Sequence, residues 1–285
     1  MAIDLHTHTN ESDGALSPAG LMLAAERLGL EAVAITDHDT FAGWDRARAE
    51  YRGPVELVCG IELSTRGPRL RGRGPVGVHV LGYFLHGGPP AEFREWLAET
   101  LRYRRERNSK LAARLRELGI NITLDEVEAL GRSLTGRPHF ARVLVRKGYA
   151  ANTADAFDRY LGESGAAYVV REEPATERAV ERIAASSGVA AVAHPVRLEN
   201  DIGSAFEPFM ALLKEKGLRA VEVWHTDHSA EDAARYLALA RKLGLVPTGG
   251  TDFHGDSKPD VKLGAGRGDM SVPLSVLNEL KALLP

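Results

Sequence analysis

The first strand-like segment of the chain carries side chains that bind divalent metal ions. The stretch DLHTHTNESDG, residues 4–14, places His6 and His8 one residue apart, with Asp13 five residues later. Alternate side chains of an extended strand share a face, so both imidazoles point the same way and Asp13 can approach the same ion from the loop. Two histidines at the end of a surface strand would give the same pattern, so the interpretation depends on further ligands elsewhere.

The elements that must position these residues alternate between short apolar strands and amphipathic helices. Strands are predicted at 3–6, 32–36, 55–62, 76–84, 189–194, 220–225 and 245–251. Helices are predicted between them at 18–28, 177–186, 205–215 and 230–243. This alternation predicts an α/β fold with parallel strands and right-handed crossovers, and seven such strands favour a closed barrel.

Residues 87–170 interrupt the alternation with helical sequence alone. The run Gly87-Gly88-Pro89-Pro90 marks the boundary. The helices predicted after it are 91–118, 124–130, 139–147 and 154–161. We therefore expect residues 1–86 and 171–285 to form the barrel, and 87–170 to form an all-helical insertion that acts as a substrate-binding lid.

Potential metal ligands recur where the predicted strands end. The C-terminal strand ends of a βα barrel meet at one mouth, so residues far apart in sequence are expected in one pocket. The nine candidates are His6, His8, Asp13, His38, Glu62, His79, His194, Asp252 and His254. A single member could be structural, but nine at such positions predict a metal site. Imidazole and carboxylate ligands suit manganese, iron or zinc.

The composition of the chain, together with the lack of a secretory signal and of a membrane-length apolar run, narrows the classes of protein that the sequence can encode. The 285 residues carry a formal net charge of −3, which does not suit a polycation that coats nucleic acid. The single cysteine, Cys59, excludes an internal disulfide and is expected to pack inside a strand. The sequence shows neither a secretory signal nor an apolar run of membrane length, so we expect a cytoplasmic protein without membrane association or an obligate protein partner.

The insertion supplies the clues to a substrate. Arg104 and Asn108 continue a leucine stripe of the helix at 91–118, which indicates that this helix crosses a wet cavity. A second helix begins near Pro138, and a helix N-terminus with a nearby arginine is suited to bind phosphate. The candidates there are Ser133, Thr135, Arg137 and His139.

Other basic residues are expected to be solvated, because runs of charge usually lie on the surface. In the long helix these are Arg102, Arg105, Arg107 and Lys110. In a predicted hairpin they are Arg66, Arg69, Arg71 and Arg73, which would otherwise add positive potential around the mouth. Trp224, His225, Asp227 and His228 follow another strand and are expected to support the site rather than bind metal.

A set of short motifs in this chain resembles the polymerase and histidinol phosphatase (PHP) family. The motifs are HTHT with Asp13, TDHD, GIE, the histidine of GVHVLGY, AHP and TDFH. The resemblance implies a distorted (βα)7 barrel, similar to a TIM barrel. It also implies two to three bound divalent ions, with manganese expected in preference to iron or zinc. It implies one ion at His6, His8, Glu62 and Asp252, a second at Glu62, His79 and His194, and a third at Asp13, His38 and His254.

The segment from GRPHFARVLVRKGY to AFDRYLGESGAAYV resembles one PHP branch, the 3′,5′-nucleoside bisphosphate phosphatases and short-RNA 5′-to-3′ exonucleases. That resemblance implies removal of the 3′-phosphate from adenosine 3′,5′-bisphosphate, with short RNA as a related substrate. We expect direct attack by a metal-bridging hydroxide, with Asp13, His194 and His254 as catalytic candidates. The alternatives are a histidinol-phosphate phosphatase and a nucleic-acid-binding module with a non-catalytic metal site.

Overall fold

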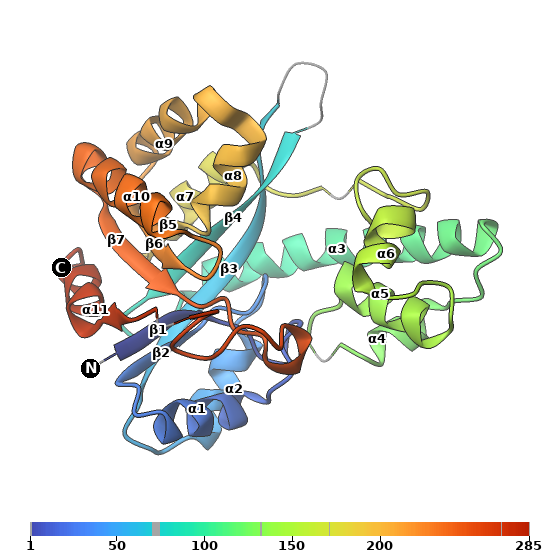
Figure 1. Ribbon diagram of the computed structural model, residues 1–285, viewed down its shortest axis with the longest axis horizontal. Coiled ribbons are helices and arrows are strands. Elements are labelled where there is room, and N and C mark those ends of the chain that lie inside the picture. The colour runs from blue at the N-terminus through green and yellow to red at the C-terminus, as the bar shows by residue number, and fades with distance from the viewer. Residues whose placement is uncertain (1, 70–74, 132, 171, 269, 285) are drawn as a thin grey trace.

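The computed structural model describes residues 2–69, 75–131, 133–170, 172–268 and 270–284. Its centre is a nearly closed barrel, which confirms the predicted α/β fold (Figure 1). The strands are β1 (Ala2–Thr7), β2 (Ala32–Ile35), β3 (Glu56–Arg69), β4 (Pro75–Phe84), β5 (Val189–Val192), β6 (Leu218–His225), β7 (Val246–Gly250) and β8 (Val272–Pro273). Their order in the sheet is β7-β6-β5-β4-β3-β2-β1-β8.

The direction of β4 differs from the prediction of parallel strands throughout. β4 pairs antiparallel with both β3 and β5, and β8 pairs antiparallel with β1. The connection from Arg69 to Pro75 is too short for a crossover and permits only a hairpin. As a result the first half of β4, not its end, reaches the mouth of the barrel, where His79 lies opposite Ser64.

The barrel closes between β1 and the end of β7. The His8 amide donates to the Phe253 carbonyl, and the Asp252 amide donates to the His6 carbonyl, each at 2.9 Å. Gly250 permits this approach, because a Cβ there would lie 2.2 Å from the His6 nitrogen. The closure brings the first and last predicted ligand segments side by side.

Small and large apolar residues alternate along β2. In β2, Ala32 and Ala34 face the barrel interior with Leu5 and Tyr83, while Val33 packs under the outer helices. The outer helices are α1 (Pro18–Arg27), α2 (Ala42–Glu50), α7 (Thr176–Ala185), α8 (Pro195–Ile202), α9 (Phe206–Glu215) and α10 (Ala230–Leu243), with α11 (Leu274–Lys281) packed on the interior cluster. Short 3₁₀ turns occupy Gly203–Ala205 and Gly255–Ser257.

The helical segment between β4 and α7 forms an arm beside the barrel (Figure 1). It contains α3 (Ala91–Glu117), α4 (Leu124–Glu128), α5 (Arg137–Arg146), α6 (Thr153–Ala156) and a π-helix at Phe157–Leu161. Phe93 and Leu97 at the start of α3 join the barrel core, whereas Leu111 and Leu115 pack in a separate core of the arm. One long helix therefore fixes the arm to the barrel.

None of the helices in the described ranges combines the length and the apolar character needed to cross a bilayer.

Candidate metal centre

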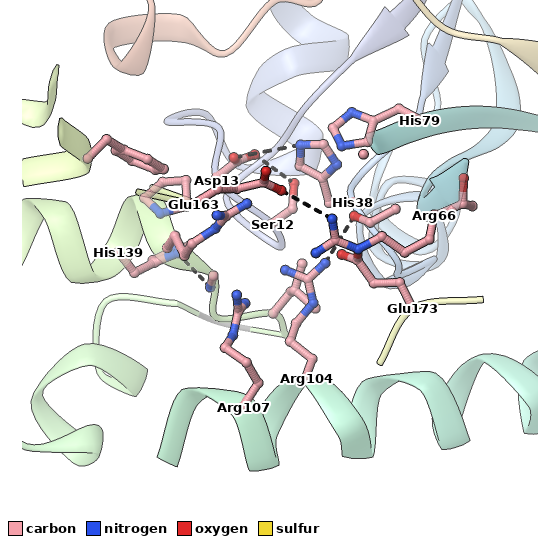
Figure 2. A pocket seen from close by; sticks show the side chains of 18 residues that line it. Ser12, Asp13, His38, Arg66, His79, Arg104, Arg107, His139, Glu163 and Glu173 are labelled. Carbon is pink, nitrogen blue, oxygen red and sulfur yellow. Dashed lines mark hydrogen bonds and ion pairs between the residues drawn. The ribbon is translucent and has the colours of Figure 1, made fainter. Parts of the chain in front are cut away.

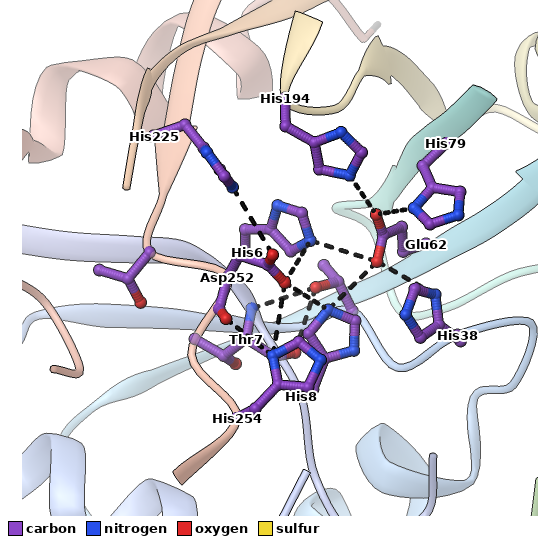
Figure 3. A network of polar contacts seen from close by, with 12 residues as sticks. His6, Thr7, His8, His38, Glu62, His79, His194, His225, Asp252 and His254 are labelled. Carbon is purple, nitrogen blue, oxygen red and sulfur yellow. Dashed lines mark hydrogen bonds and ion pairs between the residues drawn. The ribbon is translucent and has the colours of Figure 1, made fainter. Parts of the chain in front are cut away.

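The nine candidate ligands converge at the mouth of the barrel. Figure 3 shows eight of them, gathered around Glu62, and Figure 2 shows the ninth, Asp13. Glu62 comes from β3 and is fully buried, and each of its oxygens faces several imidazoles. Oε2 lies 3.3, 3.2 and 3.1 Å from nitrogens of His6, His8 and His38. Oε1 lies 2.7 Å from His79 Nδ1 and 3.0 Å from His194 Nε2.

Two other carboxylates organise the remaining histidines. Asp252 Oδ1 lies 3.6 Å from His6 Nε2 and 3.3 Å from His8 Nε2, so these side chains and Glu62 form one four-residue group. Asp13 Oδ1 lies 3.2 Å from His254 Nε2, and Asp13 Oδ2 lies 3.8 Å from His38 Nε2.

His8 stands between these two carboxylates. Its Nε2 faces Asp252, while its Nδ1 lies 3.9 Å from Asp13 Oδ1. His8 therefore belongs to both the group with Asp252 and the group with Asp13, His38 and His254.

Many of these polar atoms are buried without a conventional partner. No hydrogen bond within the described chain reaches His6 Nε2, either ring nitrogen of His8, His38 Nδ1 or Glu62 Oε2. Buried polar atoms are ordinarily paired, and a cluster of unpaired imidazoles and carboxylates suits divalent cations as the missing partners. The donor set therefore fits metal ions.

The electrostatics of the site favour the metal-binding forms of most ligands. Burial lowers the pKa of His38 and of His194 to about 3, so both rings are neutral. Burial opposes ionisation of Glu62, but the surrounding histidines hold its pKa well below the usual range. Burial also opposes the charge on His8, yet the adjacent carboxylates of Asp252 and Glu62 raise its pKa to about 9. A metal ion would replace that proton.

Two ligand positions have strained backbones. His194 has φ 30° and Asp252 has φ 56°, both in the left-handed region that non-glycine residues rarely adopt. Such residues cost on the order of 1–3 kcal/mol each and cluster at functional sites, where the surroundings hold them. The strain turns both side chains inward at the ends of β5 and β7.

Glu222 is the residue of this site that the sequence analysis missed. It is fully buried in β6, and its Oε1 lies 2.9 Å from His6 Nδ1. Burial raises its pKa, but His6 and His225 lower it to about 2 overall. The available signal was a lone carboxylate within the apolar strand AVEVWH.

His225, predicted to support the site, lies beside Glu222 and Asp252. Its Nδ1 accepts a hydrogen bond from the Asp227 amide at 3.0 Å. The neutral ring therefore carries its proton on Nε2, which lies 3.7 Å from Asp252 Oδ2. This tautomer does not suit direct metal binding.

A cavity extends from the metal centre toward the helical arm (Figure 2). Asp13, His38, His79 and Arg66 line the wall formed by the barrel. The wall formed by the arm carries Arg104, Arg107, Arg137 and His139, and Glu163 and Glu173 also line the cavity. The sequence analysis was wrong about two of these basic residues. Arg107 is 6% exposed rather than solvated. Arg66, with 16% of its side chain exposed, pairs with Glu173 at the cavity edge.

The other basic residues fall outside this cavity. Arg102 and Arg105 have 63% and 73% of their side chains exposed, and Lys110 is exposed, as predicted. Arg71 and Arg73 lie outside the described residues, as does the side chain of Arg69.

Arg104 binds to side chains of the barrel. It forms a buried ion pair with Asp39 and donates to Ser64 Oγ at 3.2 Å. The Ser64 amide in turn donates to Asp39 at 2.8 Å. Arg104 thus connects α3 to the mouth of the barrel in addition to lining the cavity.

Arg137 and His139 open α5 at the cavity wall. The guanidinium of Arg137 lies over the rings of Phe157 and Tyr168 and donates to the Leu161 carbonyl at 3.3 Å. His139 Nδ1 accepts from the Gly136 amide at 3.2 Å, which leaves its proton on Nε2. Burial lowers the pKa of His139, so this ring is a neutral donor.

The structure does not place Asn108, Ser133 and Thr135 in that cavity. They line a neighbouring hollow, where Asn108 donates to the Thr135 carbonyl at 2.8 Å and Ser133 donates to Glu11. These contacts fix the loop before α5 against α3 and the barrel.

An α/β barrel with buried histidine–carboxylate clusters at its mouth is typical of metal-dependent hydrolases. Comparison with known proteins agrees. The PHP domain model matches residues 4–73. The chain is 34% identical to the 5′-3′ exoribonuclease Rnm of Escherichia coli, with 88% of this chain and 84% of the relative covered. It is 31% identical to the 3′,5′-nucleoside bisphosphate phosphatase of Chromobacterium violaceum, over 88% and 87%.

A third relative carries a different name. The phosphoribosyl 1,2-cyclic phosphate 1,2-diphosphodiesterase of Eggerthella lenta is 33% identical, over 90% of this chain and 95% of the relative. A solved structure from Bifidobacterium adolescentis, described as a metal-dependent phosphoesterase, is similar with a TM-score of 0.81 and 29% identity, over 98% and 95%. The chain belongs to the PHP family and is a phosphoesterase.

Proposed function

We propose that the protein removes the 3′-phosphate from nucleoside 3′,5′-bisphosphates, converting adenosine 3′,5′-bisphosphate into AMP and phosphate. The cavity that joins the metal ligands to the arginines of the arm carries this proposal. A substrate with two phosphates matches both walls: the scissile phosphate at Asp13, His38 and His79, and the 5′-phosphate at Arg107 and Arg137. Guanidinium groups suit phosphate because they donate parallel, charge-assisted hydrogen bonds.

The proposed mechanism uses three ion positions. The first would use His6, His8, Glu62 and Asp252, the second Glu62, His79 and His194, and the third Asp13, His38 and His254, with His8 in reach. Divalent ions there, manganese in our proposal, would lower the pKa of water and neutralise phosphoryl oxygens.

The protein's own groups have separate tasks. In this proposal His139 donates its Nε2–H to an oxygen of the 5′-phosphate. The positively charged guanidinium of Arg137 lies on the same wall and attracts that phosphate. A ring that gives a proton to the departing 3′-oxygen must be protonated and not bound to an ion. Of the two candidates, His194 and His254, the buried His194 is neutral, so we propose His254 for this role in the state in which no ion occupies its Nε2. Asp13 Oδ1 lies 3.2 Å from His254 Nε2 and would accept a hydrogen bond from that nitrogen before the proton is given to the 3′-oxygen.

Water is the nucleophile in this proposal. Cys59 is buried and burial raises its pKa, so it is no thiolate. Of the two serines that line the cavity, Ser12 donates to Asp37 at 2.6 Å and Ser64 accepts from Arg104. A single turnover in oxygen-18 water should therefore label the released phosphate. Unlabelled phosphate or a trapped phosphoenzyme would exclude direct attack by water.

Short RNA with a 5′-phosphate is the extended substrate that we propose. The name of the Escherichia coli relative favours it. Both reactions break the bond between phosphorus and the 3′-oxygen of a nucleoside that carries a 5′-phosphate. The same two walls of the cavity therefore serve both.

A substrate panel tests the proposal with manganese-reconstituted protein. The panel contains adenosine 3′,5′-bisphosphate, 3′-AMP, short 5′-phosphorylated RNA, histidinol phosphate and a ribose 1,2-cyclic phosphate. We expect kcat/KM for the bisphosphate to exceed that for 3′-AMP roughly 10- to 150-fold, the factor that a charge-assisted hydrogen bond of about 1.5–3 kcal/mol provides. Equal values for these two, or preference for histidinol phosphate or the cyclic phosphate, would refute it.

A further inference from the structure

Glu222 contacts two of the predicted metal ligands at once. Its Oε1 lies 2.9 Å from His6 Nδ1, and its Oε2 accepts a hydrogen bond from the His194 backbone amide at 2.6 Å. The side chain is fully buried inside the barrel, where water cannot replace either contact. Both bonds therefore depend on this one carboxylate.

The first contact determines the tautomer of His6. A carboxylate only accepts hydrogen bonds, so His6 Nδ1 must carry the proton. In the neutral ring, the form that binds metal, the lone pair is then on His6 Nε2, which lies 3.3 Å from Glu62 Oε2 and 3.6 Å from Asp252 Oδ1. This is the orientation that a histidine needs to bind an ion between those carboxylates.

The second contact holds a strained backbone. His194 has φ 30° and ψ 60°, a conformation that persists only when neighbouring groups enforce it. The bond from its amide to Glu222 anchors this conformation, which places the ring 3.0 Å from Glu62 Oε1. His6 and His194 belong to different ion positions, and Glu222 connects them.

We propose that Glu222 is the positioning residue that aligns His6 and His194 and thereby couples two metal positions of the centre. His225 Nε2 lies close to the same carboxylates, 4.0 Å from Glu222 Oε2 and 3.7 Å from Asp252 Oδ2. The proposal rests on the metal dependence of the family and is independent of the nucleotide substrate.

The variant Glu222→Gln separates these roles, because an amide has one acceptor where the carboxylate has two. If its oxygen faces His6, the amide NH₂ group meets the His194 N–H and that bond is lost. If the NH₂ group faces His6 instead, Nδ1 must accept and the proton moves to Nε2, which blocks the metal lone pair. Either orientation impairs one ligand.

Tyr83→Phe is the matched control. Tyr83 is also fully buried inside the barrel, and its hydroxyl donates to the Leu5 carbonyl at 3.0 Å. This variant removes a buried hydrogen bond close to the site without touching His6 or His194. It reports the cost of a structural change alone.

The experiment measures manganese affinity by equilibrium dialysis and histidine tautomers by long-range ¹H–¹⁵N NMR. We expect Glu222→Gln to weaken manganese binding roughly 10- to 100-fold, as loss of such supporting carboxylates typically does, while Tyr83→Phe retains the wild-type Kd. In the metal-free wild type, His6 should carry its proton on Nδ1. Wild-type affinity in Glu222→Gln would overturn the proposal. So would a His6 Nδ1 that carries no proton in the wild type, a result that does not require the variant to fold.

Discussion

At the residue scale, Glu62 explains why this site must bind cations. One carboxylate lies within 3.3 Å of ring nitrogens from five histidines, all at least partly buried. The sequence revealed these residues because each is polar and interrupts or ends an apolar strand. Glu222 was not predicted as a residue of the site, because its neighbours Val221 and Val223 are apolar. A strand pattern alone does not show which buried carboxylate contacts which histidine.

Glu62→Gln should be among the most damaging single changes. The amide keeps the shape but removes a charge that two ion positions share, so we expect kcat to fall by roughly 100-fold or more and metal content to drop. Elemental analysis and phosphate release measure both. Glu56→Gln, an exposed position on the same strand, is the control and should behave as the wild type. Normal metal content in Glu62→Gln would show that the carboxylate does not bridge.

His139 makes folding sensitive to pH. Burial lowers its pKa below the value of 6.5 that it has in the unfolded chain, so below that pH the unfolded chain binds a proton that the folded chain refuses. Stability from this group is therefore complete above pH 6.5 and declines as pH falls, by up to about 1.4 kcal/mol per pH unit.

Urea unfolding of His139→Gln at pH 7, 6 and 5 checks this effect. The free energy of unfolding of the wild type should fall more steeply toward pH 5 than that of the variant. Effects of the shared metal ligands cancel in the difference. Substitution of His86, which is exposed, should leave the wild-type slope. Identical slopes for the wild type and His139→Gln would contradict the expectation.

At the element scale, periodicity located the helices and strands but not the direction of β4. The long helix predicted at 91–118 is present as α3, because its leucine stripe specifies a helical face. Strand direction depends on the length of the connection. The hairpin predicted around Arg66–Arg69 already implied that β3 and β4 are antiparallel, which the prediction of parallel strands overlooked. The exposure of Arg107 was predicted wrongly because α3 packs against both the barrel core and the separate core of the arm. Side chains outside its leucine stripe are therefore buried as well.

Arg107 and Arg105 on α3 form a natural pair for testing the cavity. They lie two residues apart, but Arg107 is buried at the cavity wall while Arg105 is exposed and pairs with Glu128. Arg107→Ala should lower kcat/KM for adenosine 3′,5′-bisphosphate roughly 10- to 150-fold, the value of one charge-assisted contact. Hydrolysis of p-nitrophenyl phosphate, which has no second phosphate, should change little.

Arg105→Ala should leave both reactions intact. Arg137→Ala should match Arg107→Ala, whereas Arg104→Ala should also destabilise the fold because Asp39 would remain buried without its ion pair. If Arg107→Ala and Arg137→Ala hydrolyse the bisphosphate as well as the wild type does, the arm does not bind the second phosphate.

At the scale of the whole molecule, the metal centre is a product of barrel closure. Its ligands come from segments as distant as His6 and His254, and only the folded barrel brings them together. In the folded chain without ions, buried carboxylates and unpaired imidazoles crowd the mouth at a cost in stability. Metal binding and folding are therefore linked, since ions bind the assembled site and not the separate segments of the unfolded chain.

Metal removal should for this reason lower the stability of the entire barrel. An ion at 100 times its Kd stabilises the folded state by about 2.7 kcal/mol, so a melt with manganese should exceed one with chelator by several degrees or more. Asp13→Asn, which weakens only the group with His254 and His38, should retain part of this gain, while Glu62→Gln should lose most of it. Calcium, which prefers a shell of oxygen ligands, is the control ion and should restore little. Equal melting temperatures with manganese and with chelator, together with undiminished phosphate release under chelation, would show that the histidine cluster works without metal.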